Sequence, residues 1–235
     1  TRKFGAKPLQ DINLKALLGA DAPAVTLVGK TWDLHVRDDL RISQKANLEI
    51  IADSIAFMKK RVDEVIFDAE HFFDGFRANP DYALECLKAA QDGGADWIVL
   101  CETNGGRLPA DIRDAIAQVN RVIKTPLGIH CHNDGELAVA NTLAAVEMGA
   151  TSLLAPVWTP PLDTAVGSYR TVVQLVDITA SGGGYEFGFD RLRRWLDLCR
   201  RTGITGVEVA HRFTQWGANA TPGIVVSGER AFGWD

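Results

Sequence analysis

The clearest indication of the fold comes from residues 64–102, EVIFDAEHFFDGFRANPDYALECLKAAQDGGADWIVLCE. Its two ends, Glu64–Glu70 and Trp97–Cys101, are short and mostly apolar, which predicts buried strands. Pro80–Ala90, between them, starts with proline and is long enough to form a helix. Apolar strands that alternate with helices of this length predict a parallel sheet covered by helices.

The same alternation extends in both directions along the chain. Residues 181–184 are predicted to be a flexible turn, and residues 216–235 a loop or a short hairpin. We expect an α/β fold, a TIM-type (βα)8-like parallel barrel that can be incomplete because only about seven strands are recognisable. The further strands are predicted at residues 25–29, 127–132, 152–157, 171–178 and 206–213, and the further helices at 11–18, 43–61, 109–123, 136–148 and 189–202.

Composition excludes two classes of partner. The chain has 235 residues, a net charge of −5 and no basic stripe, which argues against binding to nucleic acid or to an anionic membrane. No apolar run approaches the roughly 18 residues of a membrane span. Thr1-Arg2-Lys3 leads into a mixed polar segment, so we expect no signal peptide.

The four widely spaced cysteines favour the reduced thiols of a cytoplasmic, or recombinant and soluble, protein.

The strongest candidate for a catalytic or metal-binding site is the strand end Leu127-Gly128-Ile129-His130-Cys131-His132-Asn133-Asp134. His130 and His132 are two residues apart, so on a strand their side chains share one face. Two imidazoles can bind a divalent metal, Mn²⁺ or Zn²⁺, although two protein ligands alone make a weak site. Candidates for a third ligand are Asp68, Glu70 and Glu102, which end neighbouring predicted strands.

Other interpretations of the polar strand ends stay open. A His-x-His at a strand end is by itself more often a polar edge than a metal site. The carboxylates Asp68, Glu70 and Asp74 are compatible with glycosidase-like acid and base catalysis or with a polar barrel rim.

Four motifs in order, within residues 13–149, resemble the catalytic barrel of citramalate synthase and 2-isopropylmalate synthase, in the HMG-CoA-lyase-like group. The resemblance implies a divalent metal held by His130 and His132, with Glu70, Glu102 and Thr103 as candidate catalytic residues. It also implies an aspartate and an arginine in an Arg-Asp-Gly motif on a first barrel strand, and no such motif occurs here. The motifs are VTLVGKTWDLH at 25–35, DAEHFFDG at 68–75, CETNGG at 101–106 and HCHND at 130–134.

Residues 169–235 resemble a different group, a segment of a glycoside-hydrolase-like bacterial barrel domain. The resemblance rests on FDRLRRW at 189–195, HRFTQWGA at 211–218 and FGWD at 232–235. We therefore expect a recombined or designed chimera that folds as one barrel-like domain over residues 1–235. Its parts are a synthase-like piece at 1–155, a junction at 156–168 and a hydrolase-like piece at 169–235.

Three functions compete. The leading hypothesis is a folded designed or recombined scaffold with no native turnover and at most a weak metal site, because the aspartate and arginine of the first strand are missing. Metal polarisation and oxyanion stabilisation each contribute several kcal/mol to such a reaction. One alternative is a fragmentary synthase that condenses acetyl-CoA with a 2-oxo acid and binds small-molecule acids. The other is a carbohydrate-binding or glycoside-hydrolase-like protein. An unclosed barrel edge also predicts a homodimer.

Overall fold

The computed structural model describes residues 1–155, 157, 174–209 and 223–232. The chain divides into two compact units, Thr1–Leu153 and Leu154–Asp235, and each has a hydrophobic cluster of its own. The predicted single domain over 1–235 stays a prediction, and its junction at 156–168 lies, apart from Val157, outside the described residues.

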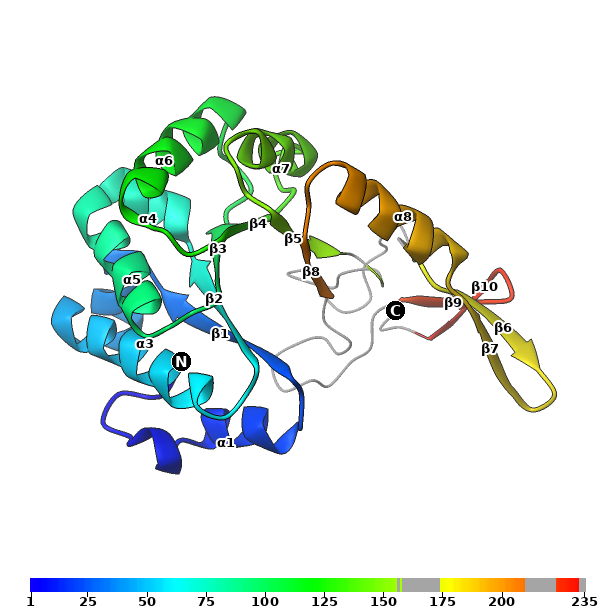
Figure 1. Cartoon of the computed structure of the whole chain (residues 1–235), viewed down its shortest axis with the longest axis horizontal. Coiled ribbons are helices and arrows are strands. Elements are labelled where there is room, and N and C mark those ends of the chain that lie inside the picture. The colour runs from blue at the N-terminus through cyan, green and yellow to red at the C-terminus, as the bar shows by residue number, and fades with distance from the viewer. Residues whose placement is uncertain (156, 158–173, 210–222, 233–235) are drawn as a thin grey trace. The chain divides into compact units, whose positions relative to one another are not determined.

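A curved parallel sheet forms the centre of the first unit (Figure 1). Its strands pair in chain order, each parallel to the next. β5 spans the boundary between the units, and β8 (Gly206–Val209) follows it in the strand order, so the described part of the sheet has six strands. The predicted α/β fold of the TIM type is therefore confirmed, as an incomplete barrel. The strands of the first five positions are β1 (Ala24–Lys30), β2 (Glu64–Glu70), β3 (Trp97–Glu102), β4 (Leu127–Cys131) and β5 (Ser152–Ala155).

Helices connect these strands and lie along the outer side of the curved sheet (Figure 1). The main connecting helices follow the predicted positions closely, and the short ones at the strand ends were not predicted. Among the described residues, no helix is both long enough and apolar enough to cross a bilayer. The helices are η1 (Pro8–Gln10), α1 (Ile12–Gly19), α2 (Asp33–His35), η2 (Val36–Leu40), α3 (Gln44–Lys59), α4 (Phe72–Ala78), α5 (Pro80–Asp92), α6 (Pro109–Val122) and α7 (Ala138–Glu147).

Local chemistry explains where several helices begin. The Ser43 hydroxyl accepts the backbone N–H of Ala46 at 3.2 Å and caps α3. Asn79 caps α5 in the same way, and Pro80 occupies the first helical position, where its missing N–H costs nothing. The helix predicted from Glu136 begins later, at Ala138, because Glu136 has a left-handed backbone with φ of 60°.

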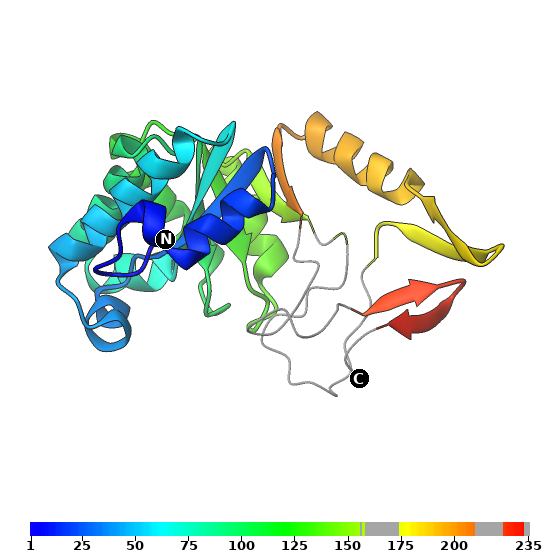
Figure 2. The ribbon, with the colours of Figure 1, turned by 90° about the horizontal axis from the view of Figure 1, so that it is seen from below.

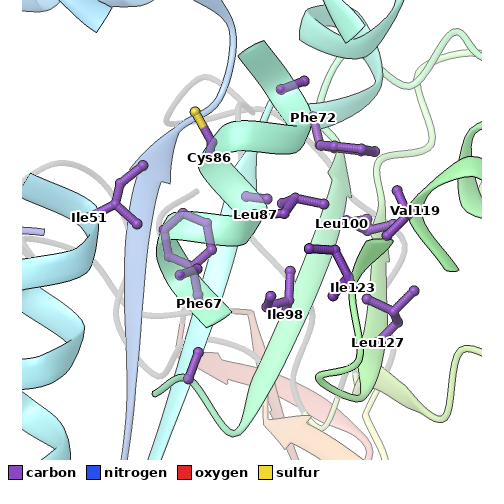
Figure 3. Close-up of a cluster of buried hydrophobic side chains, with 14 of the residues drawn as sticks. Ile51, Phe67, Phe72, Cys86, Leu87, Ile98, Leu100, Val119, Ile123 and Leu127 are labelled. Carbon is purple, nitrogen blue, oxygen red and sulfur yellow. The ribbon is translucent and has the colours of Figure 1, made fainter. Parts of the chain in front are cut away.

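The core of the first unit lies between the sheet and its helices (Figure 3). Phe67, Ile98 and Leu127 are register neighbours on three consecutive strands, and all three side chains are buried. Helices α3, α5 and α6 cover this row with Ile51, Leu87 and Val119. Because side chains alternate along a strand, every second residue faces this core and the residues between face the inside of the partial barrel.

The second unit contains two antiparallel hairpins, drawn in yellow and red in Figure 2. β6 (Asp177–Ser181) pairs with β7 (Gly184–Gly188) around Gly182 and Gly183, which both have positive φ, so the turn predicted at 181–184 is confirmed. β9 (Ile224–Val226) pairs with β10 (Glu229–Phe232), which is the short hairpin expected near the C-terminus.

The strand predicted at 171–178 is wrong in its bounds. Residues 174–176 are described and are not a strand, and residues 171–173 lie outside the described residues. The two-glycine turn fixes the register of the hairpin, which pairs Asp177 with Gly188 and so starts the strand at Asp177. Helix α8 (Asp190–Arg201) matches the predicted helix, and of the strand predicted at 206–213 only Gly206–Val209 lies in the described residues.

Candidate functional site

The ends of β2, β3 and β4 bring three ligand-capable side chains to one face of the sheet. Asp68 pairs in register with Val99, and Cys101 pairs with His130. Since Cys101 is two residues after Val99, parity places Cys101 on the same face as Asp68, and its partner His130 faces the same way. This is the face opposite to the core residues Phe67 and Leu100.

We call Asp68, Cys101 and His130 the strand-end triad. Each residue offers one ligand atom, and these atoms all lie within 4.8 Å of one another. Asp68 is 8% exposed and Cys101 5% exposed, and His130 is half-buried. A carboxylate oxygen, a thiol sulfur and an imidazole nitrogen are all donors that a divalent transition metal accepts, so the residues present fit such an ion.

His132 lies next to the triad but is not a member of it. Its ring centroid is 5.1 Å from that of His130, with the two rings tilted by 32°. It follows the end of β4, and its backbone N–H donates to the carbonyl oxygen of Glu102 at 3.0 Å. The structure therefore places the two predicted metal histidines side by side and brings only His130 together with Asp68.

Glu70 and Glu102, the other candidate third ligands, have different surroundings. The Glu70 carboxylate forms an ion pair with Lys30 at 2.6 Å, and each of these side chains is about a quarter exposed (26% and 27%). Glu102 directly follows Cys101, so its side chain is directed to the opposite face, where it is 1% exposed. The structure does not bring Glu102 into the strand-end triad.

Burial of Glu102 has an electrostatic consequence. Burial raises the pKa of its carboxyl group, the backbone N–H of Gly106 opposes this, and the charge of Asp74 adds to it. The Gly106 N–H donates to Oε1 at 3.2 Å, and Oε2 has no hydrogen-bond partner among the described residues. Glu102 therefore holds the loop that follows β3.

Thr103, the third predicted catalytic residue, accepts the backbone N–H of His71 through its hydroxyl at 2.9 Å. His71 needs such support because it has a left-handed backbone with φ of 55°. Thr103 thus ties the end of β3 to the turn that follows β2.

Asp74 is the centre of a polar cluster that sequence reasoning did not assemble. The carboxylate is 7% exposed and accepts hydrogen bonds from His71 Nδ1 at 3.0 Å, Asn104 Nδ2 at 2.7 Å and Arg107 Nη2 at 2.5 Å. Burial acts to raise the pKa of Asp74, but the three donors outweigh it and hold the pKa at about 2. The cluster joins the loops after β2 and β3, and no motif links Asp74 to an arginine so far along the chain.

Two imidazoles and an indole pack together after β1 and β2. The ring centroids of His35 and His71 are 4.5 Å apart in an edge-to-face arrangement, and Trp32 lies 4.8 Å from His35. Burial, followed by the neighbouring His71 and Lys30, lowers the pKa of His35. Its Nδ1 is buried without a hydrogen-bond partner among the described residues. His35 is therefore a neutral part of the wall around His71.

A parallel sheet with helices on one face and ligand-capable side chains at the carboxyl ends of its strands defines an α/β barrel-type protein with a candidate metal centre. Residues 8–157 match the model of the HMGL-like family, which is more than half of the chain. The chain belongs to the HMGL-like family. Residues 135–231 also match the catalytic domain of glycoside hydrolase 123. Both predicted resemblances are thus confirmed.

The relatives with curated names are synthases. The chain is 55% identical over 149 residues to the (R)-citramalate synthase of Geobacter sulfurreducens, covering 63% of this chain and 28% of that protein. It is 51% identical over 151 residues to the Aquifex aeolicus enzyme of the same name (64% and 29%), and 41% identical over 120 residues to a 2-isopropylmalate synthase of Methanocaldococcus jannaschii (51% and 23%). The chain therefore spans less than a third of the length of these relatives.

Solved structures support the fold alone, because their sequence identities are low. A Brucella melitensis HMG-CoA lyase matches with a TM-score of 0.52 at 16% identity, covering 59% of this chain and 50% of that one. A hydroxymethylglutaryl-CoA lyase from Pseudomonas aeruginosa matches with a TM-score of 0.51 at 19% identity, covering 59% and 48%.

The leading hypothesis from the sequence, a scaffold without native turnover, is wrong. Five (R)-citramalate synthases are 44–55% identical to this chain over 149–151 residues, which favours the alternative of a fragmentary enzyme of the citramalate synthase type. The missing Arg-Asp-Gly motif does not outweigh a match of this strength. That the two matched segments were joined by recombination or design stays a prediction.

Proposed function

We propose that this chain forms part of the active site of an acyltransferase of the citramalate synthase type, which condenses acetyl-CoA with a 2-oxo acid. The observation that carries the proposal is the convergence of Asp68, Cys101 and His130 at the strand ends. This convergence lies within the segment that is 55% identical to a citramalate synthase. The chain spans less than a third of that relative's length, so the activity of the whole enzyme is part of this proposal.

His130 and Asp68 would hold a divalent metal, Mn²⁺ or Zn²⁺, with His132 beside them. Such an ion, when bound, polarises the carbonyl group of a 2-oxo acid. Asp68 suits this role because its carboxylate offers an oxygen ligand within 4.8 Å of the ligand atom of His130.

Glu70 is the best placed of the three predicted catalytic residues. The condensation needs a base that takes a proton from the methyl group of acetyl-CoA. Glu70 is two residues after Asp68 on β2, so it shares the face of the strand-end triad, and Lys30 orients its carboxylate. We assign positioning roles to Glu102, which holds Gly106, and to Thr103, which holds His71.

The test is a thiol assay for CoA release from acetyl-CoA and pyruvate with Mn²⁺ or Zn²⁺. The chain is assayed alone and mixed with a fragment of the Geobacter sulfurreducens synthase that lacks the matched segment. We expect release that exceeds the rate of a His130→Ala variant under the same conditions. Equal rates for the wild type and His130→Ala, both alone and in the mixture, would contradict the proposal.

A second candidate function rests on the second unit. Its described residues form a groove of about 890 Å³ on α8, lined by Trp195, Leu198 and several arginines, Arg191, Arg194, Arg200 and Arg201. An indole beside hydrogen-bond donors suits a sugar ring, and the match to a glycoside hydrolase catalytic domain points to the same class of ligand. A chromogenic glycoside screen and a glycan array, each with a Trp195→Ala control, test this candidate. The predicted homodimer is a separate proposal, which light scattering tests.

A further inference from the structure

Lys30 and Glu70 are the last residues of β1 and β2 and direct register partners, and their side chains form an ion pair at 2.6 Å. We infer that the Lys30 ammonium group binds the thioester oxygen of acetyl-CoA and stabilises the enolate that forms there. The inference rests on the proposed function, in which Glu70 takes the proton. It gives Lys30 a second role besides orienting the Glu70 carboxylate.

Lys30 faces the same side of the sheet as the strand-end triad. It is two residues after Val28 on β1, and Val28 pairs in register with Asp68 of the triad. Because side chains alternate along a strand, Lys30 shares the face of Asp68. Val28 is 48% exposed and the Lys30 side chain 27% exposed, so the acyl end of a CoA thioester can reach this part of the face.

The spacing of the ion pair suits an acetyl group. The methyl carbon and the thioester oxygen of acetyl-CoA are bonded to the same carbon, which puts them about 2.4 Å apart when the two bonds are about 1.5 and 1.2 Å long. A base at the methyl group and a hydrogen-bond donor at the oxygen must therefore be close neighbours. Glu70 and Lys30 meet this requirement, because their charged atoms are 2.6 Å apart.

The electron balance of the step explains the need for a cation. Glu70 takes a proton from the methyl group, so a C–H bond breaks and an O–H bond forms on the carboxyl group. The C–H electron pair becomes the carbon–carbon double bond of the enolate, and a carbonyl electron pair moves to the thioester oxygen. The negative charge thus moves from Glu70 to that oxygen, and Lys30 lies beside both. A donor that is already in place where charge develops is an effective way to lower such a barrier.

The described strands offer no alternative cation for this role. Of the residues described in β1 to β5, Lys30 is the only lysine or arginine. Arg107, on the loop after β3, forms an ion pair with the buried Asp74 at 2.5 Å. His130 is assigned to the metal in the proposed function. Lys30 is therefore the residue of these strands that can place a fixed positive charge beside Glu70.

Lys59 and Asp96 provide a matched ion pair outside the site. They are also 2.6 Å apart, with side chains 36% and 32% exposed, close to the 27% and 26% of Lys30 and Glu70. Asp96 directly precedes β3 and accepts the backbone N–H of Val65 near the start of β2, so this pair lies at the amino ends of the strands. Lys59→Met therefore removes a similar ion pair and leaves the carboxyl ends unchanged.

The first experiment measures binding by isothermal titration calorimetry. The probes are acetyl-CoA and a CoA analogue that ends in a carboxylate in place of the thioester, which carries the charge of the enolate. Glu70→Gln imitates the protonated base, so we expect it to bind the carboxylate probe more tightly than acetyl-CoA. Adding Lys30→Met should reduce this preference by about tenfold or more, the value of one hydrogen bond to a charged group. Adding Lys30→Arg or Lys59→Met should retain most of it.

This comparison separates charge stabilisation from a purely structural role. If Lys30 served only to hold Glu70 in place, its loss would change the affinity for both probes alike. The same preference with and without Lys30→Met, or no preference in Glu70→Gln, would overturn the inference. Circular dichroism checks that each variant is folded.

The second experiment measures CoA release in the mixture with the synthase fragment. We expect Lys30→Met to lower kcat by about 10²–10³-fold, the usual cost of removing one oxyanion donor, with a much smaller change in the KM for acetyl-CoA. Lys30→Arg should recover part of the rate, and Lys59→Met should have the wild-type rate.

The two experiments distinguish the inference from the proposed function. His130-dependent CoA release that continues at the wild-type rate in Lys30→Met would overturn the inference and leave the proposed function standing. A Lys30-dependent preference for the carboxylate probe, in a chain without His130-dependent CoA release, would support Lys30 as the residue that binds the oxygen of a CoA ester and contradict the proposed function.

Discussion

Cys101 on β3 and His130 on β4 are direct register partners in the parallel sheet, and parity puts both side chains on the face opposite to the hydrophobic core. The adjacent Cys131 and Glu102 are register partners too, and they face the core side. On each of these strands, a shift of one residue thus moves from the candidate metal site to the side that packs against the helices.

Zinc should stabilise the folded chain through His130. A ligand present at 100 times its dissociation constant stabilises the native state by about 2.7 kcal/mol, which corresponds to several degrees in Tm. We expect Zn²⁺ to raise the Tm of the wild type and not that of His130→Ala, as measured by differential scanning fluorimetry. His35→Ala, which removes an imidazole outside the strand-end triad, is the control and should keep the zinc-dependent rise. A rise of equal size in His130→Ala would contradict the prediction.

Removing the charge of Asp74 should destabilise the first unit. Asp74→Asn leaves Arg107 without its buried carboxylate, and breaking such a pair costs about 3 kcal/mol. Urea unfolding at neutral pH measures this loss. Asp53→Asn is the matched control, because Asp53 pairs with Arg2 at the surface, where its side chain is 58% exposed and the pair is worth about 1 kcal/mol or less.

Asp74 should also make stability depend on acid. The pKa of Asp74 is held at about 2 in the folded state, below its ordinary value of 3.8. A lowered carboxyl pKa gives stability that is complete above the ordinary value and is lost as the pH falls towards 2, by about 2 kcal/mol. Unfolding free energies of the wild type and Asp74→Asn should therefore converge between pH 4 and pH 2. A difference that stays constant over this range would exclude the linkage.

Glu102 should behave in the opposite way. Burial raises the pKa of its carboxyl group, so the folded state favours the neutral form. Its unfavourable contribution is absent below the ordinary carboxyl pKa and grows as the pH rises through the folded-state pKa. Glu102→Gln keeps an acceptor for Gly106 and should unfold with a higher free energy than the wild type at pH 8, with a smaller difference at pH 5. A variant that is less stable at pH 8 would show that Glu102 is needed as a charge.

Gly75 should tolerate no side chain. A Cβ at this position in α4 would lie 2.5 Å from the backbone oxygen of Thr31, which cannot rotate away. We expect Gly75→Ala to lower the free energy of unfolding by about 1–3 kcal/mol. Gly19 in α1 is the matched control, since no atom lies within 4 Å of its Cβ position and alanine there should be neutral or stabilising by about 0.5–1 kcal/mol. Equal effects at both positions would contradict a steric cause.

Much of the first unit was predictable because its signals are local. The strand predicted at Glu64–Glu70 has the bounds of β2, and Trp97–Cys101 differs from β3 by a single residue. Apolar runs between helices with capping residues at their starts are enough to specify such elements. The boundary errors come from backbone conformation, as at Glu136, whose left-handed φ delays α7.

The candidate site was predictable only as a set of strand ends. The sequence predicted that His130 would lie near the carboxylates Asp68, Glu70 and Glu102. It did not show which residues pair between neighbouring strands. The register shows that Glu102 faces the core, that Lys30 engages Glu70, and that Cys101 joins Asp68 and His130. The alternation of side chains along β3 could have excluded Glu102 as a metal ligand, because adjacent residues of a strand face opposite sides and Glu102 directly follows Cys101.

The α/β alternation, the resemblance to the synthases and the residue types at the strand ends all follow from the amino-acid sequence alone. These properties depend on hydrophobic period and on motifs within short segments. Which side chains contact one another is known only from the fold, because the contacts of Asp74 with Arg107 and of Cys101 with His130 join residues 33 and 29 positions apart in the chain. These contacts depend on the register of the strands and on the packing of the helices, and neither can be derived from short segments of sequence.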